Sequence, residues 1–113
     1  MSAFSLQSGD QEFAWWVDGA GQAALFLHGF TGCKENWIGL ASRLVNWRRV
    51  MALDLPGHGM SSAPAEVDKY TMAQVSEHLV RMLDHLQIDR VDLVGYSMGG
   101  RLRLYFTLCH PQR

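Results

Sequence analysis

A serine between two glycines is the residue of this sequence best placed to do chemistry. Ser97 lies in Gly95-Tyr96-Ser97-Met98-Gly99, which matches the pattern G-x-S-x-G. This pentapeptide follows an apolar run and precedes a helical pattern, the context in which the serine occupies a sharp strand-to-helix turn with its hydroxyl exposed. Glycine at both flanks avoids a steric clash in so tight a turn. The pattern predicts that Ser97 is a catalytic serine and that the Met98 N–H, at a helix N-terminus, stabilises negative charge on a bound oxygen.

A second glycine-containing turn, His28-Gly29-Phe30-Thr31-Gly32, follows another apolar run. The loop at this place in such a fold supplies the second backbone donor to the bound oxygen, and we expect that donor to be the Phe30 N–H. The side chain of His28 is a separate question. We expect it to lie at the end of a strand and to form a hydrogen bond with the loop backbone.

The remaining candidate acid and histidine residues are expected to be structural. Asp54 and His58 lie in one Gly-Pro turn, where we expect them to brace the loop rather than align behind a serine on another strand. His78 and His85 fall within a helical pattern and His110 ends another, which favours surface or helix-end positions. None of these residues has the spacing of metal ligands, so no metal site is predicted.

Short apolar runs and amphipathic stretches alternate along the chain. Continuous apolar runs are typical of strands covered on both faces, as in parallel sheets. The Thr71-Met72-Ala73-Gln74 sequence matches a capping box and marks the start of one helix. The predicted strands cover residues 13–17, 23–28, 50–55 and 91–95, and the predicted helices cover 36–45, 71–86 and 98–109. Their order predicts an α/β fold with a mostly parallel sheet and flanking helices.

Composition excludes several classes of protein. The 113 residues are 48% hydrophobic, with 10 basic and 11 acidic residues and a net charge of -1, which offers no footprint for nucleic acid or an anionic membrane. No apolar run approaches the roughly 20 residues of a membrane span. The only two cysteines, Cys33 and Cys109, are too few for a disulfide framework and favour a reducing compartment. We expect a cytoplasmic protein, whose oligomeric state the sequence leaves open.

Three motifs together resemble the α/β-hydrolase superfamily: H-G-F-T-G, D-L-P-G-H-G-x-S and V-G-Y-S-M-G-G-R. The last is most similar to the 2-succinyl-6-hydroxy-2,4-cyclohexadiene-1-carboxylate synthases, lyases that eliminate pyruvate in menaquinone biosynthesis. The resemblance implies that Ser97 is the catalytic serine, that the Phe30 and Met98 amides form the oxyanion hole, and that Tyr96 and Arg101 contact a small anionic organic substrate. It implies no cofactor and no metal.

The chain differs from that family in two respects. The family's triad Asp and His follow the serine after a helical cap, whereas this chain reaches Arg113 without them. We therefore expect residues 1–113 to be the N-terminal part of a single α/β-hydrolase domain, without the cap and the C-terminal strands, and to be inactive alone. In addition, Arg103 and Thr107 stand in the elbow helix where small apolar residues are expected, and burying an unpaired arginine is costly.

Two other functions remain open. The same elbow serves a carboxylesterase or a C–C bond hydrolase, although a serine in place of aspartate argues against an epoxide hydrolase. Alternatively, the short chain is a non-catalytic interaction module. Its strand at residues 91–95 would then be an unprotected sheet edge that favours self-association.

Overall fold

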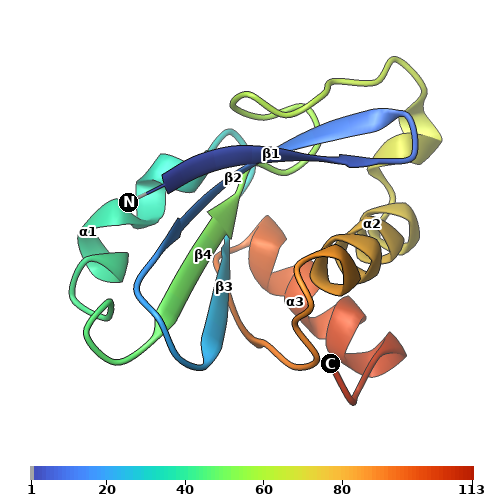
Figure 1. Ribbon diagram of the computed structural model, residues 1–113. Helices are drawn as coiled ribbons and strands as arrows, with labels where there is room; N and C mark the ends of the chain where they lie inside the picture. Colours follow the sequence, from blue (N-terminus) through green and yellow to red (C-terminus); the bar gives the residue numbers. More distant parts are fainter. Residues whose placement is uncertain (1) are drawn as a thin grey trace.

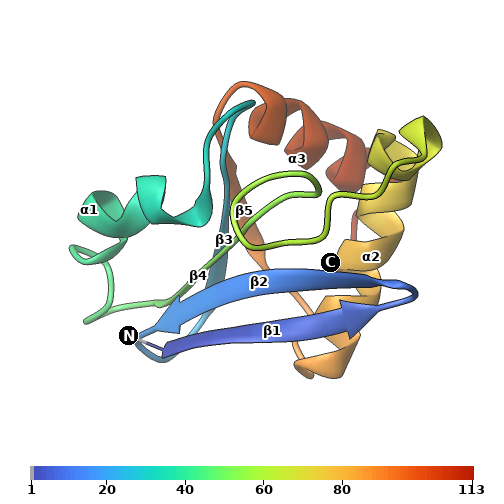
Figure 2. The ribbon, with the colours of Figure 1, turned by 90° about the horizontal axis from the view of Figure 1, so that it is seen from above.

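The computed structural model describes residues 2–113, which form one five-stranded sheet in the order β1-β2-β4-β3-β5 (Figures 1 and 2). The strands are β1 (Ser2–Ser8), β2 (Gln11–Asp18), β3 (Ala23–Leu27), β4 (Arg49–Leu53) and β5 (Asp92–Gly95). The α-helices are α1 (Ile38–Ala41), α2 (Met72–His85) and α3 (Met98–Cys109), and the 3-10 helices are η1 (Lys34–Trp37) and η2 (Val67–Tyr70).

The half of the sheet formed by β4, β3 and β5 is parallel, as predicted, but the half that contains β1 and β2 is antiparallel. β3 pairs in parallel with both β4 and β5, whereas β2 pairs antiparallel with β4 and with β1. The sheet is therefore mixed. The sequence did not predict β1, whose residues are mostly exposed or half-buried and show no continuous apolar run. A tight turn at Gly9 and Asp10 joins it to β2 as a hairpin.

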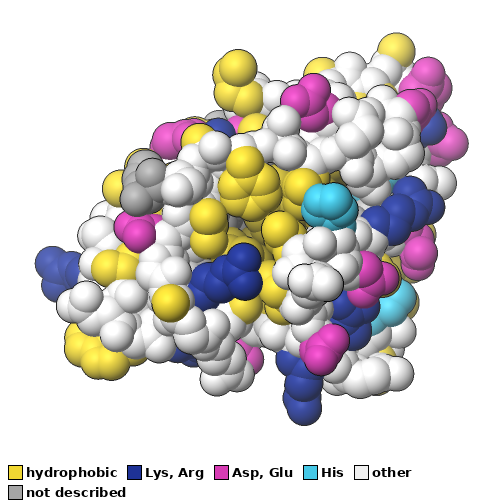
Figure 3. Space-filling view, viewed as in Figure 1, with side chains coloured by type: hydrophobic (Ala, Val, Ile, Leu, Met, Phe, Trp, Pro, Cys, Tyr) yellow, Lys and Arg dark blue, Asp and Glu magenta, His cyan; other side chains and the backbone are white. Residues whose placement is uncertain are grey.

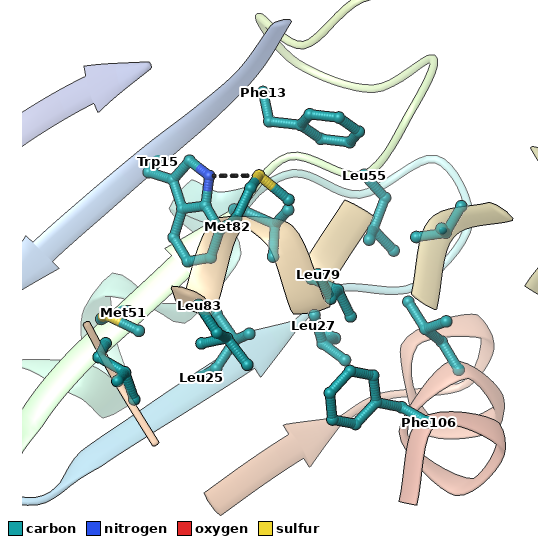
Figure 4. Packing of buried hydrophobic residues seen from close by; sticks show 14 of the residues in the cluster. Phe13, Trp15, Leu25, Leu27, Met51, Leu55, Leu79, Met82, Leu83 and Phe106 are labelled. Carbon is teal, nitrogen blue, oxygen red and sulfur yellow. Dashed lines mark hydrogen bonds between the residues drawn. The ribbon is translucent and has the colours of Figure 1, made fainter. Parts of the chain in front are cut away.

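Helices cover both faces of the sheet, which explains why its central strands are apolar throughout. α2 and α3 pack on one face, and η1 and α1 pack on the other (Figure 2). All five residues of β3 are buried. In the larger hydrophobic cluster, between the sheet and α2 and α3, Trp15 from β2 donates its indole N–H to the Met82 sulfur of α2 across 3.2 Å (Figure 4). Burial of these side chains on both faces is what fixes the strands relative to the helices.

Two of the three predicted helices are confirmed and one is shorter than predicted. α3 covers the predicted range, and α2 begins after Thr71, whose hydroxyl accepts a hydrogen bond from the Gln74 N–H at 3.2 Å. The predicted helix at 36–45 consists instead of η1 followed by the single turn of α1. At the start of η1 the Asn36 side chain accepts a hydrogen bond from the Cys33 N–H at 2.9 Å, and α1 ends at Ala41.

The prediction that His78 lies at the surface is wrong. His78 is only 4% exposed, because it projects from α2 against the turn of the β1–β2 hairpin. Its Nδ1 lies 2.6 Å from the Ser8 hydroxyl, and its Nε2 lies 3.2 Å from the Gln11 amide nitrogen. Burial lowers the pKa of His78, and the nearby Arg81 acts in the same direction. This neutral histidine thus joins the helix to the hairpin.

Within residues 2–113, one edge of β5 has no strand beside it and one side of α3 is exposed. β5 pairs with β3 alone, so its other edge has no strand partner in this part of the chain. Leu104 and Leu108 of α3 are 58% and 83% exposed. Arg103 and Thr107 are exposed as well, so the cost of burying an arginine does not arise here. Figure 3 shows apolar side chains gathered in the middle of one face, with charged groups mostly around them.

Within residues 2–113, no helix is both long and apolar enough to cross a membrane.

Candidate active site

Ser97 occupies the sharp turn between β5 and α3 that the sequence predicted. Its backbone angles, φ 52° and ψ -109°, lie in a region that residues with a Cβ rarely adopt. It is also the residue immediately before the first turn of α3, and its side chain is exposed. The strained turn therefore lifts the hydroxyl out of the sheet and places the helix N-terminus directly behind it.

The two glycines of the elbow are required by close backbone contacts. A Cβ at Gly95 would lie 2.4 Å from the Gly99 carbonyl oxygen, and a Cβ at Gly99 would lie 2.1 Å from the Leu27 carbonyl oxygen. Neither contact can be relieved by moving a flexible side chain, because both partners are backbone atoms. The elbow thus rests on the end of β3, where the second glycine-containing turn begins.

The two expected oxyanion-hole residues line the same cavity. Met98 is the first residue of α3, so its N–H has no acceptor within the helix. Phe30 is in the turn after β3, and within residues 2–113 neither N–H donates a hydrogen bond to another backbone group. The cavity has a volume of about 580 Å³. The residues that carry these two unsatisfied N–H groups thus line one cavity, as those of an oxyanion hole would, whereas Ser97 itself is not among the lining residues.

The walls of this cavity are mostly apolar. They come from the loop after β4, from the start of α2 and from the start of α3. The lining includes Leu55, Pro56, Ala63, Met72, Val75 and Leu102. Such a lining suits an uncharged part of a substrate.

Tyr96 and Arg101, the two expected substrate contacts, do not line the cavity. Tyr96 is 69% exposed and its ring packs over Gly29, where an added Cβ would lie 2.9 Å from a ring carbon. Arg101 is exposed, and its N–H donates to the Ser97 carbonyl at 3.0 Å. None of the ion pairs among residues 2–113 includes Arg101. Its guanidinium is thus an unpaired cation one helical turn beyond Ser97.

His28 and His58 brace the loops rather than activate the serine. The Nδ1–H of His28 donates to the Gly29 carbonyl at 2.7 Å, and its Nε2 accepts the Leu55 N–H at 3.0 Å. His58 donates to Pro56 and accepts from Thr31, both at 3.0 Å. Burial lowers the pKa of His28, and the neighbouring His58 acts in the same direction. Both imidazoles use both ring nitrogens, so neither is free to act as a base.

Asp54 also has a structural role, as expected, but its main partner was not predicted. The buried carboxylate accepts the Lys34 N–H at 2.7 Å, the Met60 N–H at 2.9 Å and the Lys34 ammonium at 2.9 Å. Burial opposes ionisation of Asp54, but these donors outweigh it and lower its pKa. Lys34 is missed by sequence reasoning, because a pair of residues from different loops leaves no local pattern. The ion pair joins η1 to the loop after β4.

No histidine in residues 2–113 forms a hydrogen bond with the Ser97 hydroxyl. His28, His58 and His78 are engaged elsewhere. His110 ends α3, with its Nε2 3.8 Å from a Glu77 carboxylate oxygen. This part of the chain thus contains the serine and the expected oxyanion donors but no imidazole to activate the serine.

The fold and the elbow define the class of protein. The α/β hydrolase fold family matches residues 24–113, and the chain belongs to that family. The resemblance stated from the three motifs is confirmed at this level.

Particular relatives have several different activities in their names. The chain is 38% identical over 94 residues to the "Putative 2-succinyl-6-hydroxy-2,4-cyclohexadiene-1-carboxylate synthase" of Bacillus subtilis (strain 168), covering 83% of this chain and 34% of that protein. A bacterial membrane phospholipase A superposes with a TM-score of 0.91 at 33% identity, covering 97% of this chain and 36% of the other. Epoxide hydrolase VrEH1 from Vigna radiata superposes with a TM-score of 0.88 at 28% identity, covering 98% of this chain and 36% of the other.

The chain therefore spans about a third of the length of each of these three proteins. All three names are those of enzymes, but the reactions that they name differ.

Proposed function

We propose that the intact protein is a lyase similar to 2-succinyl-6-hydroxy-2,4-cyclohexadiene-1-carboxylate synthase, with Ser97 as its catalytic serine. The observation that carries this proposal is the unpaired guanidinium of Arg101, one helical turn beyond Ser97. A guanidinium binds a carboxylate through paired hydrogen bonds, and an enzyme for neutral esters needs such a group less. The similarity to the Bacillus subtilis protein supports the same choice.

In the proposed reaction Ser97 acts as a base. A histidine that residues 2–113 do not supply takes the hydroxyl proton, and the serine oxygen then removes a proton from the substrate. The Phe30 and Met98 N–H groups stabilise the negative charge that develops on a substrate oxygen. Arg101 and Tyr96 hold the carboxylates. The electron pair of the broken C–H bond forms a double bond as the bond to the leaving group breaks, and the leaving group takes up a proton and departs as pyruvate.

Two arginines of α3 provide a matched test of this proposal. We expect Arg101→Gln to lower kcat/KM for pyruvate release by about 10- to 100-fold in the intact protein, since hydrogen bonds to a charged group are lost. Arg103→Gln, at another exposed position of the same helix, should leave the rate unchanged. Equal effects of the two substitutions, or no effect of Arg101→Gln, would refute the role of Arg101.

A second candidate, a carboxylesterase or C–C bond hydrolase, is favoured by the apolar cavity beside Met98 and Phe30. An uncharged acyl group would fit such walls better than a carboxylate would. A panel of p-nitrophenyl esters and the synthase substrate, both offered to the intact protein, separates the candidates. Faster turnover of the esters, with no pyruvate release, would favour the hydrolase.

A cytoplasmic location belongs to the same proposal. Both cysteines, Cys33 and Cys109, are free thiols, and a reducing compartment suits free thiols. Fractionation of cells that express the intact protein tests the location.

A further inference from the structure

The turn that carries Phe30 is fixed by a group from outside the turn. Gly32 N–H donates to the Gly29 carbonyl at 3.0 Å and closes the turn. Thr31, its third residue, has a φ of 66°, a value that favours glycine at this position of a turn. A threonine is strained in this conformation. A contact from elsewhere in the fold must therefore help to hold it.

The side chain of His58 makes that contact. Its Nε2 accepts the Thr31 N–H at 3.0 Å, and its Nδ1–H donates to the Pro56 carbonyl at 3.0 Å. The Phe30 ring also packs against the imidazole in a T-shaped arrangement, with 5.8 Å between the ring centroids. The ring of His28 packs against it too, at 4.8 Å. The imidazole thus bridges the loop after β4 and the turn after β3.

The orientation of the Thr31 N–H is what distinguishes alternative forms of such a turn. Turns of types I and II differ by a flip of the peptide between their second and third residues, which reverses this N–H. An acceptor at His58 favours one orientation. A flip of this peptide changes ψ of Phe30 and φ of Thr31 but leaves φ of Phe30 at about −60°. His58 therefore acts on Phe30 through the stability of the whole turn and through its contact with the Phe30 ring.

We propose that His58 is a positioning residue of the oxyanion hole, which rests on the function proposed above. The imidazole holds the Thr31 N–H and packs against the Phe30 ring, and together these two contacts keep the Phe30 backbone in place beside the cavity. His58 lines the same cavity, but both of its ring nitrogens are already engaged, so it is not the base that activates Ser97.

Two substitutions separate this role from general stability. His58→Leu removes the acceptor for the Thr31 N–H, whereas His58→Gln keeps an amide oxygen that can reach the position of Nε2. His85→Leu is the control, since His85 is an exposed histidine of α2. The measurements are hydrogen exchange of the Thr31 amide by NMR, the melting temperature, and kcat and KM of the intact protein.

We expect His58→Leu to accelerate exchange of the Thr31 amide and to lower kcat by about 100-fold with little change in KM, the effect of losing one oxyanion-hole donor. His58→Gln should restore most of the slow Thr31 exchange and most of kcat, and His85→Leu should change neither the exchange nor kcat. Unchanged Thr31 exchange in His58→Leu, an unchanged kcat, or no rescue by glutamine would overturn the proposal.

One measurement on the wild type covers the case in which His58→Leu does not fold. A through-hydrogen-bond coupling between the Thr31 amide nitrogen and His58 Nε2 is expected, and its absence would contradict the proposal. If Ser97→Ala turns over substrate as fast as the wild type, the proposed function fails instead. The coupling and the amide exchange do not depend on turnover and would still test how the turn is held.

Discussion

At the scale of single residues, the site depends on backbone atoms that approach too closely for any residue but glycine. The Cβ of an alanine at position 99 would lie 2.1 Å from the Leu27 carbonyl oxygen, so β3 and α3 would have to separate. This contact explains why a glycine is needed two residues after the strained Ser97. The strain at Ser97 is held by the packing of two elements.

We therefore expect Gly99→Ala to lower the free energy of unfolding by about 2–4 kcal/mol. Gly39→Ala is the control, because Gly39 lies in α1 and an added Cβ there meets nothing within 4 Å. It should be neutral or stabilising by up to about 1 kcal/mol. Urea denaturation measures both. Similar losses in the two variants would show that the contact with Leu27 does not matter.

Two buried histidines predict how stability depends on pH. Burial lowers the pKa of both His28 and His78 in the folded protein, so below about pH 6.5 the unfolded chain takes up protons first. The free energy of unfolding should fall as the pH falls from 6.5 towards 5, by at most about 1.4 kcal/mol per pH unit for each histidine. Denaturation at several pH values measures the slope.

His78→Gln should reduce that slope, whereas His85→Gln, on the exposed side of the same helix, should preserve it. Equal slopes in the wild type and His78→Gln would mean that His78 takes up its proton in both states alike.

At the scale of elements, the loops around the site are joined by a buried ion pair. Lys34, which is 7% exposed, and the fully buried Asp54 connect η1 to the loop after β4. Replacing the Lys34 side chain leaves the buried Asp54 carboxylate with two backbone N–H donors but no cation. The pair therefore holds the two loops that frame the cavity.

We expect Lys34→Met to cost about 3–5 kcal/mol in the free energy of unfolding. Lys69→Met removes the exposed pair of Lys69 with Asp10, at 3.5 Å, and should cost less than about 1 kcal/mol. Thermal or urea denaturation at neutral pH compares the two. A loss below about 1 kcal/mol in Lys34→Met would contradict this account of the loops.

Local patterns predicted the elements that are buried on a continuous face. β3, β4, α2 and α3 follow from apolar runs and helical spacing, because burial imposes those patterns directly. β1 was missed because only the end of this edge strand is buried. His78 could have been placed correctly, since it lies three residues after Val75 and four before Met82, on the apolar side of α2.

The site shows the same division. Ser97, Phe30 and Met98 were singled out from local turns, and the structure places the last two beside one cavity. Lys34 and the contact of His58 with Thr31 depend on the meeting of two loops. A tertiary contact of this kind has no sequence period, so pattern analysis alone cannot find it.

At the scale of the whole molecule, the open edge of β5 and the exposed leucines of α3 predict self-association of residues 1–113. An unpaired strand edge beside exposed apolar side chains is a template for pairing with another chain. Light scattering should show species larger than a monomer that increase with concentration. A monomer at all concentrations would count against an interaction module and against pairing of the exposed β5 edge with another chain.

Substitution within the exposed part of α3 tests which surface is responsible. Leu108→Lys should reduce the association, because Leu108 is 83% exposed on this helix. Val67→Lys, at an equally exposed position of η2, should leave it unchanged.

The central claim is that Ser97 performs the chemistry of the intact protein. The most direct test is the rate of pyruvate release from the synthase substrate by the wild type and by Ser97→Ala. We predict a fall in kcat of about 1,000-fold or more, since the residue that removes the proton is lost. A Ser97→Ala protein that is folded and releases pyruvate at the wild-type rate would contradict the account.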